Sequence, residues 1–318
     1  MKPLRIGFAG TPEFAATFLE LLIRSTDLPI DIQLVLTQED KPVGRKKILT
    51  ASPVKVCAGH HNIPVFHTFE ELTGKLGHLD LILVFAFGAF IPSELLSVPR
   101  LGWWNIHPSL LPLYRGPSPT AYPIMMGDSQ TGVTLIKLDE KMDHGPIIAQ
   151  ESLPVAPNMT RDELEKAVVS PAAILFLNIL KNLPEGASPE MREQEHERAT
   201  ITRLMKREHG FIPFELLAEA TNESRNISED ELPHLMKEYV QRYDSTTENK
   251  MKSESVIYNY WRALHPWPGI WTEKDGKRIK IIACELRGEK LHITAIQIDG
   301  GTVSDNKRQI SQIFEKKI

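Results

Sequence analysis

The chain has 318 residues, of which 42% are hydrophobic and 25% are charged, and its formal net charge is −4 at pH 7. This composition is typical of a folded globular protein, and it excludes disordered, collagen-like and membrane classes. At roughly 150 residues per domain, the length predicts about two domains. The net negative charge gives no general attraction to nucleic acid, so such a partner must bind a local basic patch.

The cysteine and histidine pattern predicts no disulfide and no metal site. Cys57 and Cys284 are far apart and lack metal-ligand spacing. We interpret the adjacent His60 and His61 as surface residues. The N-terminal apolar run is too short for a secretory segment, and no apolar stretch is long enough to span a bilayer. We therefore expect a cytoplasmic protein without a membrane partner, and by default a monomer.

Short apolar runs rich in branched residues recur along the first half of the chain. The run from Leu4 to Ala9 ends in a Gly-Thr-Pro turn, after which apolar residues recur at helical spacing. Alternation of strands and helices predicts a mostly parallel sheet with helices on both faces. The further runs span 30–37, 64–66, 79–85, 102–106 and 132–138.

The middle of the chain indicates a domain boundary. Thr160 and Glu163 form a capping box that opens a helix toward Leu183, and Pro171 must kink or interrupt that helix, so we expect two helical pieces. The segment 184–198 is polar and charged, as in an exposed linker. We therefore predict a catalytic domain over 1–184, a linker over 185–204 and a second domain over 205–318.

The second domain begins with a charged stretch and ends in strands. Residues 215–252 are rich in Glu and Lys, and a helix is expected over 255–264. Three β-like runs follow, at 270–272, 277–286 and 290–298. They predict a small antiparallel sheet or barrel.

Asn105 and His107 are the first candidates for chemistry. They lie two residues apart at the end of a predicted strand, so both side chains point to one face. The loop Pro108–Pro112 follows, at the strand end where open parallel sheets bind ligands. Alternatively, the pair only satisfies backbone groups of the loop.

Asp143 follows another predicted strand, so we expect it at the same edge of the sheet and within reach of His107. A carboxylate beside an imidazole favours the charged ring and orients it, and an Asn amide can donate to a developing oxyanion. The equal alternative is that Asp143 shapes the turn before Gly145.

Three separated motifs together resemble the folate-dependent formyltransferases: Asn105-x-His107, Ser109–Pro112 with Tyr114-Arg115-Gly116, and Met142-Asp143-x-Gly145. The resemblance implies a Rossmann-like α/β domain, 10-formyltetrahydrofolate as formyl donor, and catalysis by Asn105, His107 and Asp143. It also implies folate contacts at Ser109, Leu110, Leu111, Pro112, Phe85, Phe87, Gly88 and Ile91.

Other segments concern the acceptor. Residues 9–14, 37–47, 52–55 and 265–269 resemble the family members that formylate initiator methionyl-tRNA. Cations suited to tRNA phosphates are Lys41, Arg45, Lys46, Lys47 and, after the linker, Lys206, with Arg45 the strongest candidate. For the lysine cluster alone, a solvated surface loop is the simpler interpretation.

The C-terminal part departs from the family pattern. The stretch 215–252 looks like an insertion, and strands are missing after Leu286. We therefore expect an abbreviated OB-like barrel, and we keep formylation of an amino sugar nucleotide as the alternative reaction.

Overall fold

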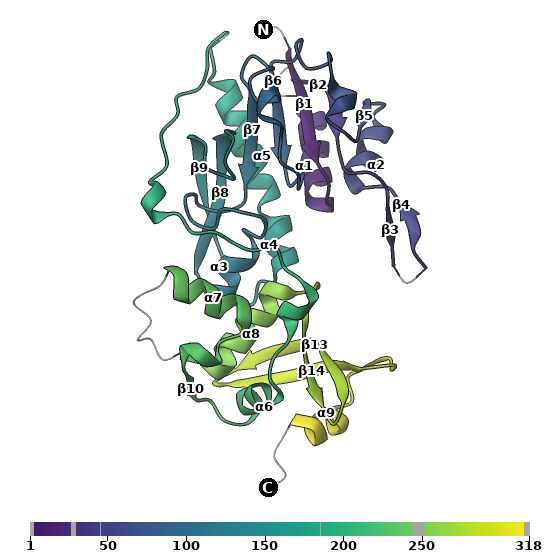
Figure 1. The fold of residues 1–318 in the computed structure, drawn as a ribbon, viewed down its shortest axis with the longest axis vertical. Coiled ribbons are helices and arrows are strands. Elements are labelled where there is room, and N and C mark those ends of the chain that lie inside the picture. Colours follow the sequence, from purple (N-terminus) through teal and green to yellow (C-terminus); the bar gives the residue numbers. More distant parts are fainter. Residues whose placement is uncertain (1–2, 27–29, 45, 185, 244–250, 315–318) are drawn as a thin grey trace. The chain divides into compact units, whose positions relative to one another are not determined.

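The computed structural model describes residues 3–26, 30–44, 46–184, 186–243 and 251–314. It divides into two compact units (Figure 1). The first unit takes in Met1–Pro119, Gln130–Pro154 and Glu165–Ile201, and the second takes in Thr120–Ser129, Val155–Leu164 and Thr202–Ile318. Arg45, the strongest predicted tRNA contact, lies outside the described residues.

A seven-stranded sheet forms the frame of the first unit, in the order β5-β2-β1-β6-β7-β8-β9. The first five of these strands run parallel, and β8 and β9 are antiparallel to their neighbours. This confirms the predicted Rossmann-like, mostly parallel sheet. The strands are β1 (Leu4–Gly10), β2 (Ile30–Leu36), β5 (Val65–Phe66), β6 (Leu81–Phe85), β7 (Trp103–His107), β8 (Gln130–Lys137) and β9 (Ile147–Pro154).

Aromatic side chains pack one face of this sheet against helices. Phe8 of β1 stacks on Phe18 of α1 (Glu13–Arg24), with ring centroids 6.1 Å apart. Trp104 of β7 meets Phe176 of α5 (Val169–Lys181) edge to face at 6.3 Å. A third helix, α2 (Pro53–His60), packs against α1.

The opposite face is covered mainly by connecting segments rather than by long helices. Trp103 and Ile82 pack there with Leu72, from the 3₁₀ turn η1 (Glu70–Leu72), and with Phe87. The turn η2 (Ser93–Leu95) belongs to the next connection, and its Leu95 packs on the same cluster. The expectation of helices on both faces was therefore too simple, because short connections fill this face with single apolar side chains.

The predicted break at Pro171 is confirmed. One helix, α4, spans Arg161–Ala167 and the next, α5, begins at Val169. Pro171 lies in the first turn of α5, where its missing N–H costs least.

The segment predicted as an exposed linker contacts the first unit closely. Arg192 pairs with Ile147 in a two-way backbone bridge, and Gln194 is 5% exposed. The contact-based unit extends to Ile201. Most described residues of the segment are exposed, as expected for a linker, and Gln194 is the buried exception because its amide bonds to the loop at Asp143 and Gly145.

The second unit combines helices with a four-stranded antiparallel sheet, in the order β12-β13-β14-β15. Within the described residues this sheet is open, since β12 pairs only with β13 and β15 only with β14. The predicted small antiparallel sheet is confirmed, whereas no closed barrel is seen in that part of the chain. The strands are β12 (Ile270–Lys274), β13 (Lys277–Arg287), β14 (Lys290–Ile298) and β15 (Val303–Ser304).

The described residues of the charged stretch, 215–243 and 251–252, are built into this unit. Its helices bury apolar faces, with Leu217 and Leu235 both fully buried. Two helices, α6 (Phe214–Asn222) and α7 (His234–Tyr243), come from this stretch, and its strand β10 (Asn226–Ile227) pairs with β11 (Met251–Lys252). The other helices of the second unit are α3 (Ala121–Met126), α8 (Ser253–Leu264) and α9 (Lys307–Phe314). No helix among the described residues has the length and apolar character needed to cross a membrane.

Phe176→Ala tests the aromatic packing of the first unit. Phe176 is fully buried, so the substitution should lower the free energy of unfolding by about 3–5 kcal/mol through lost transfer energy and a cavity. Denaturant titration followed by tryptophan fluorescence measures the change. Ile174→Ala on the same helix, where the side chain is 57% exposed, should cost much less; equal losses would contradict the packing described here.

Candidate active site

Alternation along β7 separates core residues from candidate catalytic residues. Trp104 points to the helical face, where it contacts Phe176. Trp103, Asn105 and His107 alternate with it and therefore share the opposite face. The prediction that Asn105 and His107 point the same way is confirmed, because both approach the same oxygen of Asp143.

A backbone carbonyl fixes the orientation of the His107 ring. Nε2 of His107 lies 2.9 Å from the carbonyl oxygen of Tyr114, which can only accept, so Nε2 carries a proton. Tyr114 has φ +61°, a strained conformation that turns this part of the loop back toward the strand. The other nitrogen, Nδ1, is left to face Asp143.

Asp143 is held by donors from two other segments. Its Oδ2 accepts a 2.7 Å hydrogen bond from the backbone N–H of Gly116, and its Oδ1 accepts one of 3.3 Å from Nδ2 of Asn105. Oδ1 also lies 3.5 Å from Nδ1 of His107. The predicted proximity of Asp143 and His107 is therefore confirmed.

The route by which Asp143 reaches His107 differs from the expectation. Strand β8 is antiparallel to β7, with Lys137 opposite Trp104 and Thr134 opposite His107. Its carboxyl end therefore lies at the other edge of the sheet, and the loop after it folds back over the strands. Asp143 has φ +49°, which helps the loop make this return.

Gly145 makes that close return possible. A Cβ on this residue would lie 1.9 Å from the carbonyl oxygen of Lys137, which no side chain tolerates. The neighbouring Pro146 carbonyl accepts from the backbone N–H of Lys137 at 3.0 Å. A glycine is thus required for the Asp143 loop to press against β8.

Gln194 is a site residue that the sequence analysis missed. Its Nε2 donates to the carbonyl oxygens of Asp143 at 2.9 Å and Gly145 at 2.7 Å. Its Oε1 accepts from Nε and Nη2 of Arg115, at 3.1 and 2.6 Å. The amide therefore fixes the Asp143 loop to Arg115. In the sequence, the one feature that sets Gln194 apart is that it is an uncharged amide between charged residues.

Arg115 supplies positive charge behind Asp143. Burial lowers the pKa of Arg115, and the nearby carboxylates of Asp143 and Asp139 oppose that shift, so the guanidinium remains charged. Its Nη2 also donates to Nδ1 of His196 at 2.8 Å, and the His196 ring stacks on His144 with centroids 4.0 Å apart. Arginine, carboxylates and rings thus form one connected polar network.

The loop Ser109–Pro112 is fixed both by its own hydrogen bonds and by contacts with strands β8 and β9. Ser109 is fully buried and its hydroxyl donates to the carbonyl oxygen of Leu113 at 2.7 Å. Leu111 is 3% exposed and packs with Ile136 and Ile147. Leu110 and Pro112 are half-buried, so their side chains remain accessible for a ligand.

The predicted folate residues on the neighbouring connection take different positions. Phe85 is fully buried between Phe14 and Phe18, in the core beneath α1, so its side chain is not available to a ligand. Phe87 is 5% exposed and its carbonyl oxygen accepts from Gln38 Nε2 at 3.1 Å. Gly88 is exposed, whereas Ile91 packs partly against the apolar cluster.

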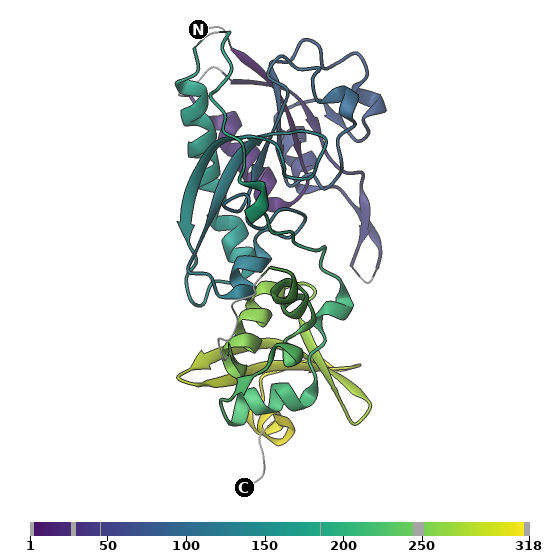
Figure 2. The same ribbon diagram turned by 60° about the vertical axis from the view of Figure 1, so that its left-hand side comes forward.

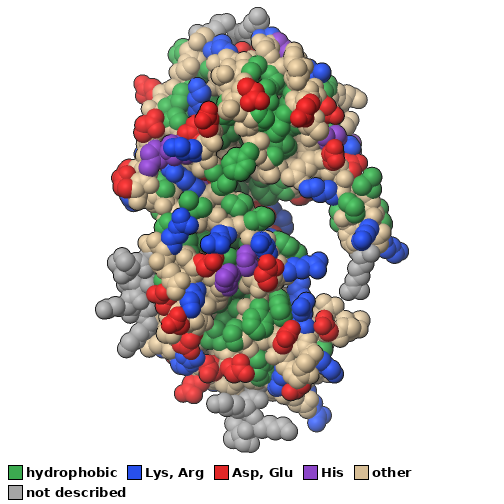
Figure 3. All heavy atoms as spheres, in the orientation of Figure 1, with side chains coloured by type: hydrophobic (Ala, Val, Ile, Leu, Met, Phe, Trp, Pro, Cys, Tyr) green, Lys and Arg blue, Asp and Glu red, His purple; other side chains and the backbone are tan. Residues whose placement is uncertain are grey.

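The predicted basic residues near the N-terminus lie on a projecting hairpin. Strands β3 (Lys41–Val43) and β4 (Ile48–Thr50) pair with each other alone, away from the main sheet (Figures 1 and 2). Lys41, Lys46 and Lys47 are exposed on it, and apolar side chains lie among the basic ones (Figure 3). Lys206, the remaining predicted cation, is exposed in the second unit with Glu208 at 3.9 Å.

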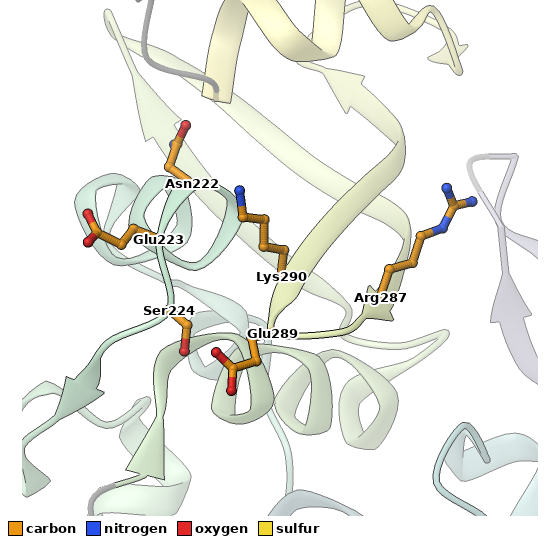
Figure 4. Close-up of a pocket in the computed structure, with 6 residues that line it drawn as sticks. All are labelled: Asn222, Glu223, Ser224, Arg287, Glu289 and Lys290. Atoms are coloured by element: carbon orange, nitrogen blue, oxygen red, sulfur yellow. The ribbon is translucent and has the colours of Figure 1, made fainter.

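A pocket of about 500 Å³ lies in the second unit, between the end of α6 and the turn joining β13 to β14 (Figure 4). Basic and acidic groups both surround it, so charge alone favours neither an anion nor a cation. Its lining residues are Asn222, Glu223, Ser224, Arg287, Glu289 and Lys290.

Comparison with known protein families agrees with this arrangement. Residues 4–180 match the formyl transferase family, and residues 251–313 match the formyl transferase C-terminal domain. The chain belongs to the formyl transferase family. It is thus a one-carbon transferase, and the sequence resemblance is confirmed.

Two curated relatives with the same name illustrate the similarity. The methionyl-tRNA formyltransferase of Chloroflexus aggregans (strain MD-66 / DSM 9485) is 39% identical over 289 residues, which are 89% of this chain and 81% of the relative. That of Thermotoga maritima (strain ATCC 43589 / DSM 3109 / JCM 10099 / NBRC 100826 / MSB8) is 35% identical over 298 residues, 90% of this chain and 92% of the relative.

Solved structures share the fold. The N-formyltransferase of Helicobacter canadensis, solved with folinic acid and dTDP-3-aminofucose, is 19% identical with a TM-score of 0.60, covering 94% of this chain and 98% of that chain. A sugar 3N-formyl transferase solved with dTDP and 5-N-formyl-THF is 18% identical with a TM-score of 0.58, covering 95% and 97%.

Gln194→Ala tests the role of the missed residue. The substitution leaves two buried carbonyls without their donor and frees the Asp143 loop, so the rate of formyl transfer should fall by about 100-fold. Steady-state kinetics measures this loss, and thermal unfolding separates it from lost stability. Glu195→Ala, at an exposed neighbour, is the matched control. Wild-type turnover in a folded Gln194→Ala protein would contradict the assignment.

Proposed function

We propose that this enzyme transfers the formyl group of 10-formyltetrahydrofolate to the α-amino group of initiator methionyl-tRNA. The observation that carries the proposal is the convergence of Asn105 and His107 on one oxygen of Asp143. The curated relatives compared above are named for methionyl-tRNA, which supports this acceptor over an amino sugar nucleotide. The low identity of the sugar-acting structures limits their support to the fold.

In this proposal the amine attacks the formyl carbon directly. A bond forms from the amine nitrogen to the formyl carbon, the bond from that carbon to N10 of the folate breaks, and the amine proton passes to N10. His107 carries the proton through Nδ1, because Nε2 is committed to the Tyr114 carbonyl. This differs from the usual triad geometry, in which the carboxylate and the reacting group occupy opposite nitrogens, because Asp143 and the transferred proton here share Nδ1.

Asn105 and Asp143 stabilise the charges that develop. The Asn105 amide has a second N–H besides the one directed at Asp143, and that N–H binds the formyl oxygen as it becomes negative. Asp143 stabilises the imidazolium formed when His107 takes up the proton. Because Gly116 holds the other carboxylate oxygen, Asp143 needs little movement to do so.

The folate is proposed to lie between the loop 108–112 and the connection 86–92. Half-buried Leu110 and Pro112 offer apolar contacts from the first of these loops. Phe90, in the second, is 70% exposed, and a flat ring can stack on an aromatic donor. Phe90 was not singled out by the sequence analysis, and exposure is what identifies it.

The hairpin β3–β4 is proposed to bind the acceptor stem. Val43, Ile48 and Leu49 are 55%, 62% and 67% exposed, which is unusual for clustered apolar residues and marks a surface that another molecule covers. The neighbouring Lys46 and Lys47 suit phosphates. Arg45, between these groups in sequence, stays a prediction. So does Lys206 from the second unit.

The remaining expectations belong to the same proposal. A cytoplasmic location agrees with the free thiols of Cys57 and Cys284. The C-terminal unit is proposed to contact tRNA as well. Action as a monomer and the boundaries of the functional domains stay predictions.

His107→Ala tests the chemistry. Loss of the proton acceptor should lower the rate of transfer by about 10²–10⁴-fold, with folate affinity nearly unchanged. The measurement uses 10-formyltetrahydrofolate with charged initiator tRNA, and in parallel with amino sugar nucleotides. His107→Gln keeps a donor for the Tyr114 carbonyl and should be equally impaired. Near-normal turnover of either variant would contradict the role of His107, and activity on sugars alone would contradict the acceptor.

Replacing Lys46 and Lys47 together by Ala tests the hairpin. If both bind phosphates, KM for the tRNA should rise and the slope of log affinity against log salt should fall by about 2. A salt series of tRNA binding measures this, with folate binding expected to be unchanged. Lys181→Ala, an exposed lysine on α5, is the control. An unchanged salt slope would exclude the hairpin as a phosphate contact.

A further inference from the structure

A cluster of three metal-ligating side chain types lies outside the proposed active site. Oε2 of Glu20, on α1, is 2.7 Å from Nε2 of His61 and 3.5 Å from Sγ of Cys57. The three ligand atoms all lie within 4.8 Å of one another. His61 was expected to be a surface residue without a partner, and this pairing corrects that interpretation.

The sequence places two of these groups on one helical face. Cys57 lies in the last turn of α2, and His61, four residues on, is the C-cap that follows the helix, so the two side chains lie about one turn apart. Packing of α1 against α2 adds Glu20 from a segment 37 residues away. The contact between helices, and not a spacing motif, therefore creates the cluster.

The surroundings also resemble those of a metal site. Oε1 of Glu20 is bound by Nε of Arg24 at 2.5 Å, which orients the carboxylate as outer partners of metal ligands do. Cys57 is 8% exposed, whereas the side chains of Glu20 and His61 are about 30% exposed. One side of the cluster is thus closed by protein and the other is open to solvent.

We propose that Glu20, Cys57 and His61 bind a thiophilic divalent cation of the Zn²⁺ class, with water as a fourth ligand. Tetrahedral zinc with one sulfur, one nitrogen and one oxygen ligand needs about 3.3–3.7 Å between ligand atoms. The Glu20–Cys57 separation already matches this range, and the Glu20–His61 pair must open by less than about 1 Å. The cation displaces the protons that now join these groups.

The cation would cross-link α1 and α2. Helix α2 begins beside the projecting hairpin, where Ser52 caps the helix and bonds to Thr37, and Lys55 pairs with Asp40 at 2.7 Å. A cross-link at the far end of α2 would therefore stabilise the helix that carries the base of the hairpin. The inference does not depend on the proposed formyl transfer.

Cobalt substitution of the full-length protein tests the site. The metal-stripped protein is titrated with Co²⁺, and we expect one ion per chain with a thiolate-to-cobalt charge-transfer band, together with a Zn²⁺-dependent rise in the unfolding temperature. Zn²⁺ competition then gives the zinc affinity. Cys57→Ser should abolish the band, and Glu20→Gln and His61→Ala should weaken Zn²⁺ binding at least about tenfold.

His60→Ala is the matched control, because the adjacent imidazole is exposed and is not part of the cluster. It should bind Co²⁺ like the unaltered chain. Binding without a charge-transfer band, equal loss in His60→Ala, or no binding at micromolar metal would each overturn the proposal. In those cases Glu20, Cys57 and His61 form only an ordinary ion pair beside a thiol.

Discussion

The active-site arrangement depends on how the Asp143 carboxylate is held. A carboxylate with little exposure is costly unless hydrogen bonds and opposite charge compensate it, and both are present. The Gly116 N–H and the Asn105 amide bind its two oxygens, while Arg115 lies near enough to stabilise it electrostatically. These groups come from β7 and the loop that follows it, whereas Asp143 comes from the loop after β8, so forming this one site requires the two loops to assemble together.

The need to hold these loops together explains why Gln194 and Thr200, which follow helices α4 and α5 in the chain, belong to the site. Gln194 uses both its donors and its acceptor, joining Asp143 and Gly145 to Arg115. Thr200 then receives the backbone N–H of Tyr114 on its hydroxyl, and its carbonyl accepts from the N–H of Arg115. The loop that orients His107 is therefore held in place by hydrogen bonds from Thr200, which lies outside the sheet. The geometry of the candidate active site is therefore set by backbone carbonyls and amides as well as by its side chains.

The sequence predicted those features of the fold that depend on neighbouring residues alone. Apolar runs located the strands, and alternation on β7 correctly put Asn105 and His107 together. Strand direction and packing are non-local, so the antiparallel β8 and the buried position of Phe85 were not foreseen. Gln194 was not predicted as a site residue because the charged composition around it is typical of a linker. A single amide can nevertheless be buried when every polar atom is paired. The cluster around Glu20 depends on helix packing, which no spacing reveals.

The β3–β4 hairpin carries exposed apolar side chains, and its base contacts the connection proposed to hold the folate. Such residues reduce solubility, so their retention requires a gain elsewhere. The hairpin base is not isolated, because Gln38 donates to the carbonyl of Phe87, which Thr11 also binds at 3.3 Å. Gln38 therefore joins the base of the hairpin to the connection proposed to hold the folate. Because β2 and β6 are parallel strands ending at the same edge, this coupling needs only one hydrogen bond. The segments proposed to bind tRNA and folate are thus in direct contact within the first unit.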